Sequence, residues 1–134
     1  AVAVPAHGSW SADVEGMLGH FVDVTWAFRF GPQSVHAIVA TVEDGTDSPP
    51  QAFLFPTGPL QERVDRQVVT VERDGSDLLL TSSTLLDDVR IACSGLPTDS
   101  SFFLEPHRWR RVRDVVGSAT LTCHRLNTSL VIGR

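Results

Sequence analysis

The chain has 134 residues, of which 42% are hydrophobic, enough for the core of one domain or two small ones and too many for a disordered chain. Its formal net charge of −5 argues against nucleic acid and anionic membrane as partners. No apolar run approaches the roughly 18–20 residues of a membrane helix, and residues 1–6 lack the basic and apolar regions of a signal peptide. Because the sequence does not open with Met, we expect it to begin inside a longer polypeptide.

The first 60 residues alternate less regularly than the rest of the chain. Residues 8–18 fit either a strand or a helical stripe, and residues 21–30 are aromatic and β-branched. Residues 35–42 and 51–55 have the composition of strands. Gly and Pro gather at residues 57–60, where the charge balance also changes, and this predicts a domain boundary.

From residue 61 onward, alternation with a period of two dominates. Residues 67–72 and 78–82 flank an Asp-Gly pair, which predicts a β-hairpin because Gly adopts positive φ without penalty. Further strands are predicted at residues 89–93, 101–105, 109–115 and 119–126. Strands at such short spacing, with turn residues between them, are typical of an all-β, immunoglobulin-like antiparallel β-sandwich.

The two cysteines, Cys93 and Cys123, match neither a metal-binding spacing nor a CxxC pair. Both fall on the apolar side of alternating segments, so they could face each other inside a sandwich. Two buried free thiols are the simplest interpretation. A disulfide stays open for an exported protein, and a reactive thiol is the least favoured reading.

The sequence contains no motif of a catalytic or cofactor site, because GxSxG, P-loop and GxGxxG patterns are all missing. Asp87-Asp88 and Glu43-Asp44 are adjacent carboxylates, and neighbours on a strand point to opposite faces, so we interpret them as solvated turn acids. The five histidines have no HxH or HExxH spacing. We therefore predict no catalytic residue, no metal site and no cofactor.

Residues 108–113 form the one basic run, with Trp109 among four arginines. On a strand, Trp109 and Arg111 would share one face. The acids Glu105 and Asp114 flank the run and lower its positive electrostatic potential, which disfavours a nucleic-acid or phosphate site. We interpret the run as an edge strand whose arginines disfavour pairing with a strand of another chain. The alternative is a docking surface for a neighbouring domain.

The aromatic side chains have two interpretations. Most of the aromatic side chains of Trp10, Trp26 and the Phe102-Phe103 pair are expected to fill the core, and a sugar-stacking platform is the alternative. The candidate residues for domain docking or sugar contact are Trp109, Arg111 and Trp26.

A resemblance to a known family is carried by residues 18–32, Phe53-Leu54-Phe55-Pro56, Val89-Arg90-Ile91 and residues 99–106. Residues 12–56 resemble the segment after the catalytic barrel of bacterial β-mannosidase-like enzymes in glycoside hydrolase family 2. Residues 67–112 resemble the last immunoglobulin-like domain of the same enzymes. The chain departs from the pattern at His107-Arg108, where such domains usually have Gly-Glu.

The resemblance implies that residues 1–58 are the later strands of one immunoglobulin-like sandwich and residues 59–134 a second, small one. It places no catalytic residue here, because the acid/base and nucleophile glutamates of the family lie on the barrel. The implied function is a non-catalytic accessory region of an exo-glycosidase, a hydrolase of terminal β-D-mannosyl linkages. Its partners would be the barrel and the other domains of its parent chain.

The resemblance also implies a bacterial, cytoplasmic protein, with export left open. Two alternatives belong to other classes of protein. One is a free-standing carbohydrate-binding or adhesion-type sandwich, which an exposed aromatic strip would favour. The other is an unrelated small β-barrel enzyme or ligand carrier, which would need a deep pocket lined with polar groups.

Overall fold

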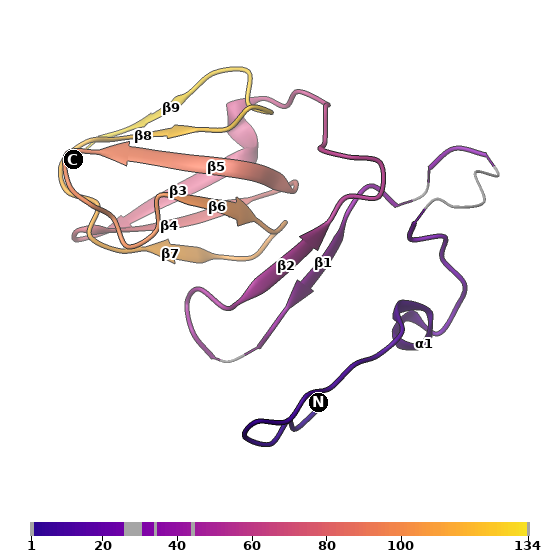
Figure 1. The fold of residues 1–134 in the computed structure, drawn as a ribbon. Helices are drawn as coiled ribbons and strands as arrows, with labels where there is room; N and C mark the ends of the chain where they lie inside the picture. Colours follow the sequence, from indigo (N-terminus) through magenta and orange to yellow (C-terminus); the bar gives the residue numbers. More distant parts are fainter. Residues whose placement is uncertain (1, 26–30, 34, 44, 134) are drawn as a thin grey trace.

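The computed structural model describes residues 2–25, 31–33, 35–43 and 45–133. This part of the chain forms nine strands in antiparallel sheets and one short α-helix, which confirms the predicted all-β class. Figure 1 shows a sandwich made by the C-terminal strands, a two-stranded hairpin beside it, and an N-terminal stretch that leads away from both. None of the helices described is long and apolar enough to cross a bilayer.

The N-terminal part contains helix α1 (Val14–Leu18) and strands β1 (Ile38–Thr41) and β2 (Gln51–Leu54). The helix forms because its ends are capped: the Asp13 side chain accepts hydrogen bonds from two backbone N–H groups of the first turn, and Gly19 closes the helix at φ 74°. The strands predicted at 35–42 and 51–55 are confirmed with shorter bounds, and they pair antiparallel.

The C-terminal part begins with a short 3₁₀ helix, η1, and continues with seven strands. Their bounds are η1 Arg66–Val68, β3 Val69–Asp74, β4 Asp77–Ser82, β5 Leu86–Cys93, β6 Ser101–Leu104, β7 Arg110–Val112, β8 Ala119–Thr122 and β9 Leu130–Ile132. All the predicted strands of this region are present, whereas β9 was not predicted. Its three residues are too short a run to show alternation.

The seven strands form two sheets in the orders β3-β4-β7 and β6-β5-β8-β9. The chain crosses between the sheets after β4, after β6 and after β7, while β3-β4, β5-β6 and β8-β9 are consecutive antiparallel neighbours. With β5, β8 and β9 in the places of strands C, F and G, this is an immunoglobulin-like arrangement. The fourth strand of that sheet, β6, lies beside β5 at the edge.

The β3-β4 hairpin has a tighter turn than the sequence predicts. Asp74 pairs with Asp77, so the loop consists of Gly75 and Ser76 alone. Gly75 has φ 61°, a conformation that costs other residues free energy and that two-residue hairpin loops require. The predicted Asp-Gly signal is therefore confirmed, but Asp74 belongs to the strand.

The core lies between the inward faces of the two sheets. On β5, Val89 and Ile91 are buried and Arg90 is exposed, which confirms the predicted alternation. On β4, Leu78 and Leu80 have no exposed surface. The core is formed by Val69, Leu78, Leu80, Leu86, Val89, Ile91, Phe102, Leu104, Val112, Val115, Ala119, Leu121 and Leu126.

The start of β5 breaks this alternation. The register against β6 shifts between Leu86 and Val89, and Asp88 adopts φ 54°. The extra residue turns both Leu86 and Asp87 inward, and Asp87 is only 5% exposed. The interpretation of Asp87 as a solvated turn acid was therefore wrong: Asp87 lies two residues before Val89 within the strand and shares its buried face.

The two cysteines are free and half-buried. They lie on neighbouring strands of one sheet: Cys93 pairs with Ala119, whereas Cys123 follows Thr122, the partner of Arg90. Four positions along a strand correspond to about 13 Å, too far for a disulfide bond. The structure therefore has two free, half-buried thiols rather than a disulfide, and it does not place them face to face across the core.

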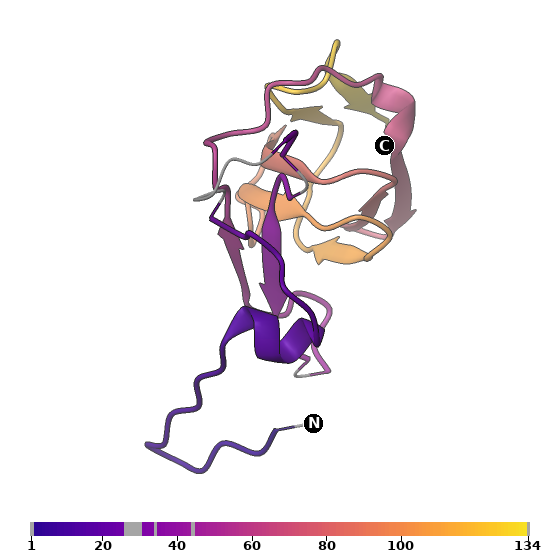
Figure 2. The same cartoon turned by 90° about the vertical axis from the view of Figure 1, so that its right-hand side faces the viewer.

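The residues that precede the sandwich are mostly exposed to solvent. Among residues 2–63 that the structure describes, only Pro49 is buried. Several large apolar side chains are at least half exposed, including Val2, Val4, Trp10 and Met17. Trp10 was expected in the core and is 52% exposed, so that expectation was wrong. Figure 2 shows the same stretch leading away from the sandwich in a second view.

Leu80→Ala is expected to lower the free energy of unfolding by about 2–5 kcal/mol, because truncating this fully buried side chain leaves a cavity. Leu96→Ala removes the same atoms from a side chain that is 94% exposed, and should change the free energy of unfolding by less than about 0.5 kcal/mol. Urea unfolding followed by circular dichroism measures both variants. Equal losses would contradict the packing described for β4.

Candidate functional site

The arginines of residues 108–113 lie on and around β7, the edge strand beside β4. Each of the four has at least one carboxylate partner. The ion pairs join Arg108 to Glu43 and Glu105, Arg110 to Asp99, Arg111 to Asp47, Asp74 and Asp77, and Arg113 to Asp47. The charges that the sequence presents as a basic run are therefore neutralised in the fold.

Arg111 is the centre of this network. Its Nη1 atom lies 2.9 Å from Asp74 Oδ2 and 3.1 Å from Asp77 Oδ2, at the β3-β4 turn. Its Nε atom lies 3.3 Å from Asp47, in the loop between β1 and β2, and its backbone N–H donates to the Asp47 carbonyl. One guanidinium thus joins the sandwich to the N-terminal hairpin.

A second contact joins the hairpin to the end of β6. The Oε2 atom of Glu105 accepts hydrogen bonds of 2.8 Å from the Thr41 hydroxyl and from the Gln51 amide. Beside it, the ring of Phe103 meets Phe53 edge-on at a centroid distance of 4.4 Å. Polar and aromatic contacts from both strands of the hairpin therefore fix its position against the sandwich.

The structure describes two of the three candidate residues, Arg111 and Trp109. Arg111 binds the hairpin, so β7 is both an arginine-rich edge strand and a docking surface within this chain. Trp109 precedes β7 and is 44% exposed. Trp26 lies outside the described residues. The pair Phe102-Phe103 divides between the two faces of β6, with Phe102 in the core beneath the Arg110 guanidinium and Phe103 against the hairpin.

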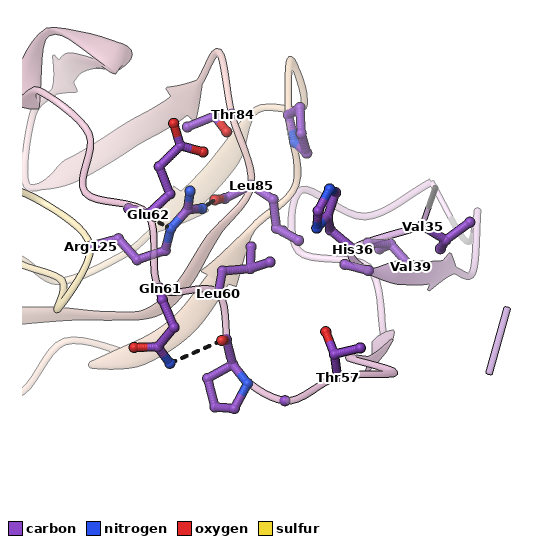
Figure 3. A pocket seen from close by; sticks show the side chains of 14 residues that line it. Val35, His36, Val39, Thr57, Leu60, Gln61, Glu62, Thr84, Leu85 and Arg125 are labelled. Atoms are coloured by element: carbon purple, nitrogen blue, oxygen red, sulfur yellow. Dashed lines mark hydrogen bonds between the residues drawn. The ribbon is translucent and has the colours of Figure 1, made fainter. Parts of the chain in front are cut away.

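A cavity of about 800 Å³ lies between the approach to β1 and the sandwich (Figure 3). His36 and Val39 line it from the hairpin side, and Leu85 and Arg125 line it from the sandwich. Residues 57–62, which lead from the hairpin to the sandwich, also line it, with Thr57 and Gln61 on its lower side in this view. Its size is that of a pocket for a small ligand, and its walls are mainly apolar with a few polar groups.

Arg125 serves a structural purpose at this cavity. It is 4% exposed, and its guanidinium donates to the backbone carbonyl oxygens of Glu62, at 2.9 Å from Nε, and of Leu85. Arg63 adds a hydrogen bond to the carbonyl of Leu126. These bonds attach the linker to the end of β8 and the start of β5. No sequence pattern marks this role, because the acceptors are backbone atoms far away in the chain.

The adjacent acids Asp87 and Asp88 have opposite surroundings. Two hydrogen bonds from Arg90, each 2.9 Å long, lower the pKa of Asp88 below its ordinary value at the surface. Asp87 is buried and lies beside Cys123 and His124. Burial raises the pKa of the Cys123 thiol, so it is protonated at neutral pH. The sequence did not indicate this group, since Asp87 is 36 residues from Cys123.

Comparison with protein-family models, curated proteins and solved structures finds no match to this chain.

Arg125→Met is expected to lower the free energy of unfolding by about 1–3 kcal/mol, because the buried carbonyl oxygen of Leu85 and the partly buried one of Glu62 lose their donor. Arg66→Met is the matched control, since Arg66 is exposed, and its effect should stay below about 0.5 kcal/mol. Chemical denaturation of both variants measures the difference. A neutral Arg125→Met variant would show that the linker does not depend on these bonds.

Arg111→Gln is expected to speed hydrogen exchange in β1 and β2 while leaving β4 and β8 protected, because Arg111 holds the hairpin loop through Asp47. Arg90→Gln breaks an ion pair on the other sheet and should leave exchange in the hairpin unchanged. Exchange followed by mass spectrometry of peptides resolves the two regions. Uniform acceleration in both variants would argue against a local role for Arg111.

Proposed function

We propose that this chain is a non-catalytic accessory region of a family 2 glycoside hydrolase of the β-mannosidase type, and that it braces the catalytic barrel. The proposal starts from the resemblance of residues 12–56 and 67–112 to the region that follows the barrel in those enzymes. The parent enzyme would hydrolyse terminal β-D-mannosyl linkages with two barrel carboxylates, one as nucleophile and one as acid/base.

The observation that carries the proposal is the uncovered apolar surface of the N-terminal stretch. Val2 and Val4 are 55% and 51% exposed, Trp10 is 52% exposed, and Met17 and Leu18 are 67% and 50% exposed. Single exposed apolar residues are ordinary, but so many in one short stretch are typical of an interface. In the proposed enzyme, the barrel and the other domains of the parent chain would cover them.

The contacts of the hairpin explain how such a region could act as a brace. A hairpin can hold a neighbouring domain in position only if the hairpin itself is fixed against the sandwich. Here the hairpin is held by Glu105, by Arg111 and by the aromatic contact of Phe103. A domain docked on residues 2–25 would thereby be joined to a sandwich with its own core.

The test is the intact mass of the native gene product, isolated with an antibody raised against the sandwich and assayed on a β-mannoside in the same sample. We expect a mass several times the 14.6 kDa of this chain, together with hydrolysis that retains the anomeric configuration. The isolated chain of 134 residues is the control and should not hydrolyse the substrate.

A native mass near 14.6 kDa without hydrolysis would overturn the proposal. A large product that hydrolyses another glycoside would overturn the assignment of the substrate and leave the accessory role. In the first case, the exposed Trp109 would be the residue to replace in a direct assay of sugar binding.

A further inference from the structure

Three side chains of different chemistry meet where β5 begins and β8 ends. One ligand atom each from Asp87, Cys123 and His124 lies within 4.8 Å of the other two. The His124 Nε2 atom is 3.6 Å from Asp87 Oδ2, and the Cys123 thiol donates to the Asp87 carbonyl oxygen at 3.1 Å. The pairing of β5 with β8 produces this meeting, because Cys123 and His124 directly follow β8.

Asp87 is poorly compensated for a buried carboxylate. Its side chain is 7% exposed, and its Oδ1 atom is buried without a hydrogen-bond partner among the described residues. Within the same part of the chain, the basic side chain within 4.0 Å of its carboxylate is the ring of His124, at 3.6 Å, whereas the buried guanidinium of Arg125 donates to backbone carbonyls. A carboxylate removed from water without partners is costly unless a cation joins it.

The three groups are the ligands that zinc prefers. Cysteine thiolate, histidine nitrogen and carboxylate oxygen bind Zn²⁺ at about 2.0–2.3 Å, which places tetrahedral ligand atoms roughly 3.5 Å apart. To bind the ion, the distances between the observed ligand atoms therefore need to shorten by little more than about 1 Å. The His124 side chain is 43% exposed, and the ion would replace the hydrogen bond of its Nε2 atom to the Leu60 carbonyl.

We propose that Asp87, Cys123 and His124 bind one zinc ion. The thiolate and the carboxylate together neutralise its charge, and the thiol proton leaves to solvent when the Zn–S bond forms. Two of the three ligands, Cys123 and His124, line a surface hollow of about 340 Å³ together with Thr122, Asp88 and Arg90, and a fourth ligand would enter from this hollow. The site is thus open to water or to an exchangeable ligand.

The inference goes beyond the proposed function and does not depend on it, since it uses only residues of the sandwich. The sample is the reduced chain of 134 residues without a histidine tag. Zn²⁺ alone is titrated into it and binding is measured by calorimetry. In a separate titration, Co²⁺ alone is added and binding is measured by absorption spectroscopy. We expect one Zn²⁺ per chain. Bound Co²⁺ should give a thiolate charge-transfer band in the near ultraviolet, which zinc then removes.

The two cysteines supply a matched pair of variants. Cys123→Ser should abolish the cobalt charge-transfer band, whereas Cys93→Ser should keep it, because Cys93 is equally free and half-buried but lies outside the group. His124→Ala should weaken zinc binding at least about tenfold, since even the loss of a residue behind a ligand has that effect. Asp87→Asn keeps the shape of the side chain and should weaken binding in the same direction.

Circular dichroism decides whether each variant is folded. If Cys123→Ser does not fold, the exposed His124 still tests the site, because its replacement does not disturb the core. The proposal is overturned if the wild-type chain binds no stoichiometric zinc. It is equally overturned if folded His124→Ala binds zinc as tightly as the wild type, or if Cys93→Ser loses the cobalt band.

Discussion

The contact of β4 with the opposite sheet is the constraint on which the rest of the structure depends. Leu78 and Leu80 are fully buried between the sheets, and so is Leu121 on β8. At roughly 25 cal/mol per Å² of apolar surface removed from water, these side chains supply a large share of the driving force for a sandwich of this size. β4 also pairs with β3 on one side and with β7 on the other, so its burial fixes all three strands.

The polar surface follows from that placement. Because Leu78 pairs with Val112 and Leu79 with Arg111, the inward face of β4 sets which side of β7 is buried. Val112 turns into the core, and the neighbouring Arg111 turns outward, where the acids of the β3-β4 turn and of the β1-β2 loop lie. The hairpin is therefore held by a strand whose orientation the core decides.

Local patterns predicted the parts of the fold that local physics determines. The alternation of Val89, Arg90 and Ile91 predicted one face of β5, and Gly75 marked a turn that needs positive φ. Contacts between distant residues escaped prediction, such as the bonds from Arg111 to the hairpin loop and from Arg125 to backbone carbonyls. A side chain that binds backbone atoms leaves no signal in the residue types of its partners.

At the start of β5 the environment predicted for a charged residue was wrong, because Asp87 lies two residues before Val89 and therefore on the buried face of the strand. Three unusual features coincide there: the positive φ of Asp88, the inward turn of Asp87 and a carboxylate oxygen without a partner among the described residues. Each of them costs free energy, and a fold keeps such costs mainly where they support a function. A bulge places one extra residue in a strand, so that residues on its two sides no longer alternate in strict sequence. Asp87 meets Cys123 and His124 because it lies two residues before Val89, on the buried face of β5, while the extra residue of the bulge keeps Leu86 buried as well.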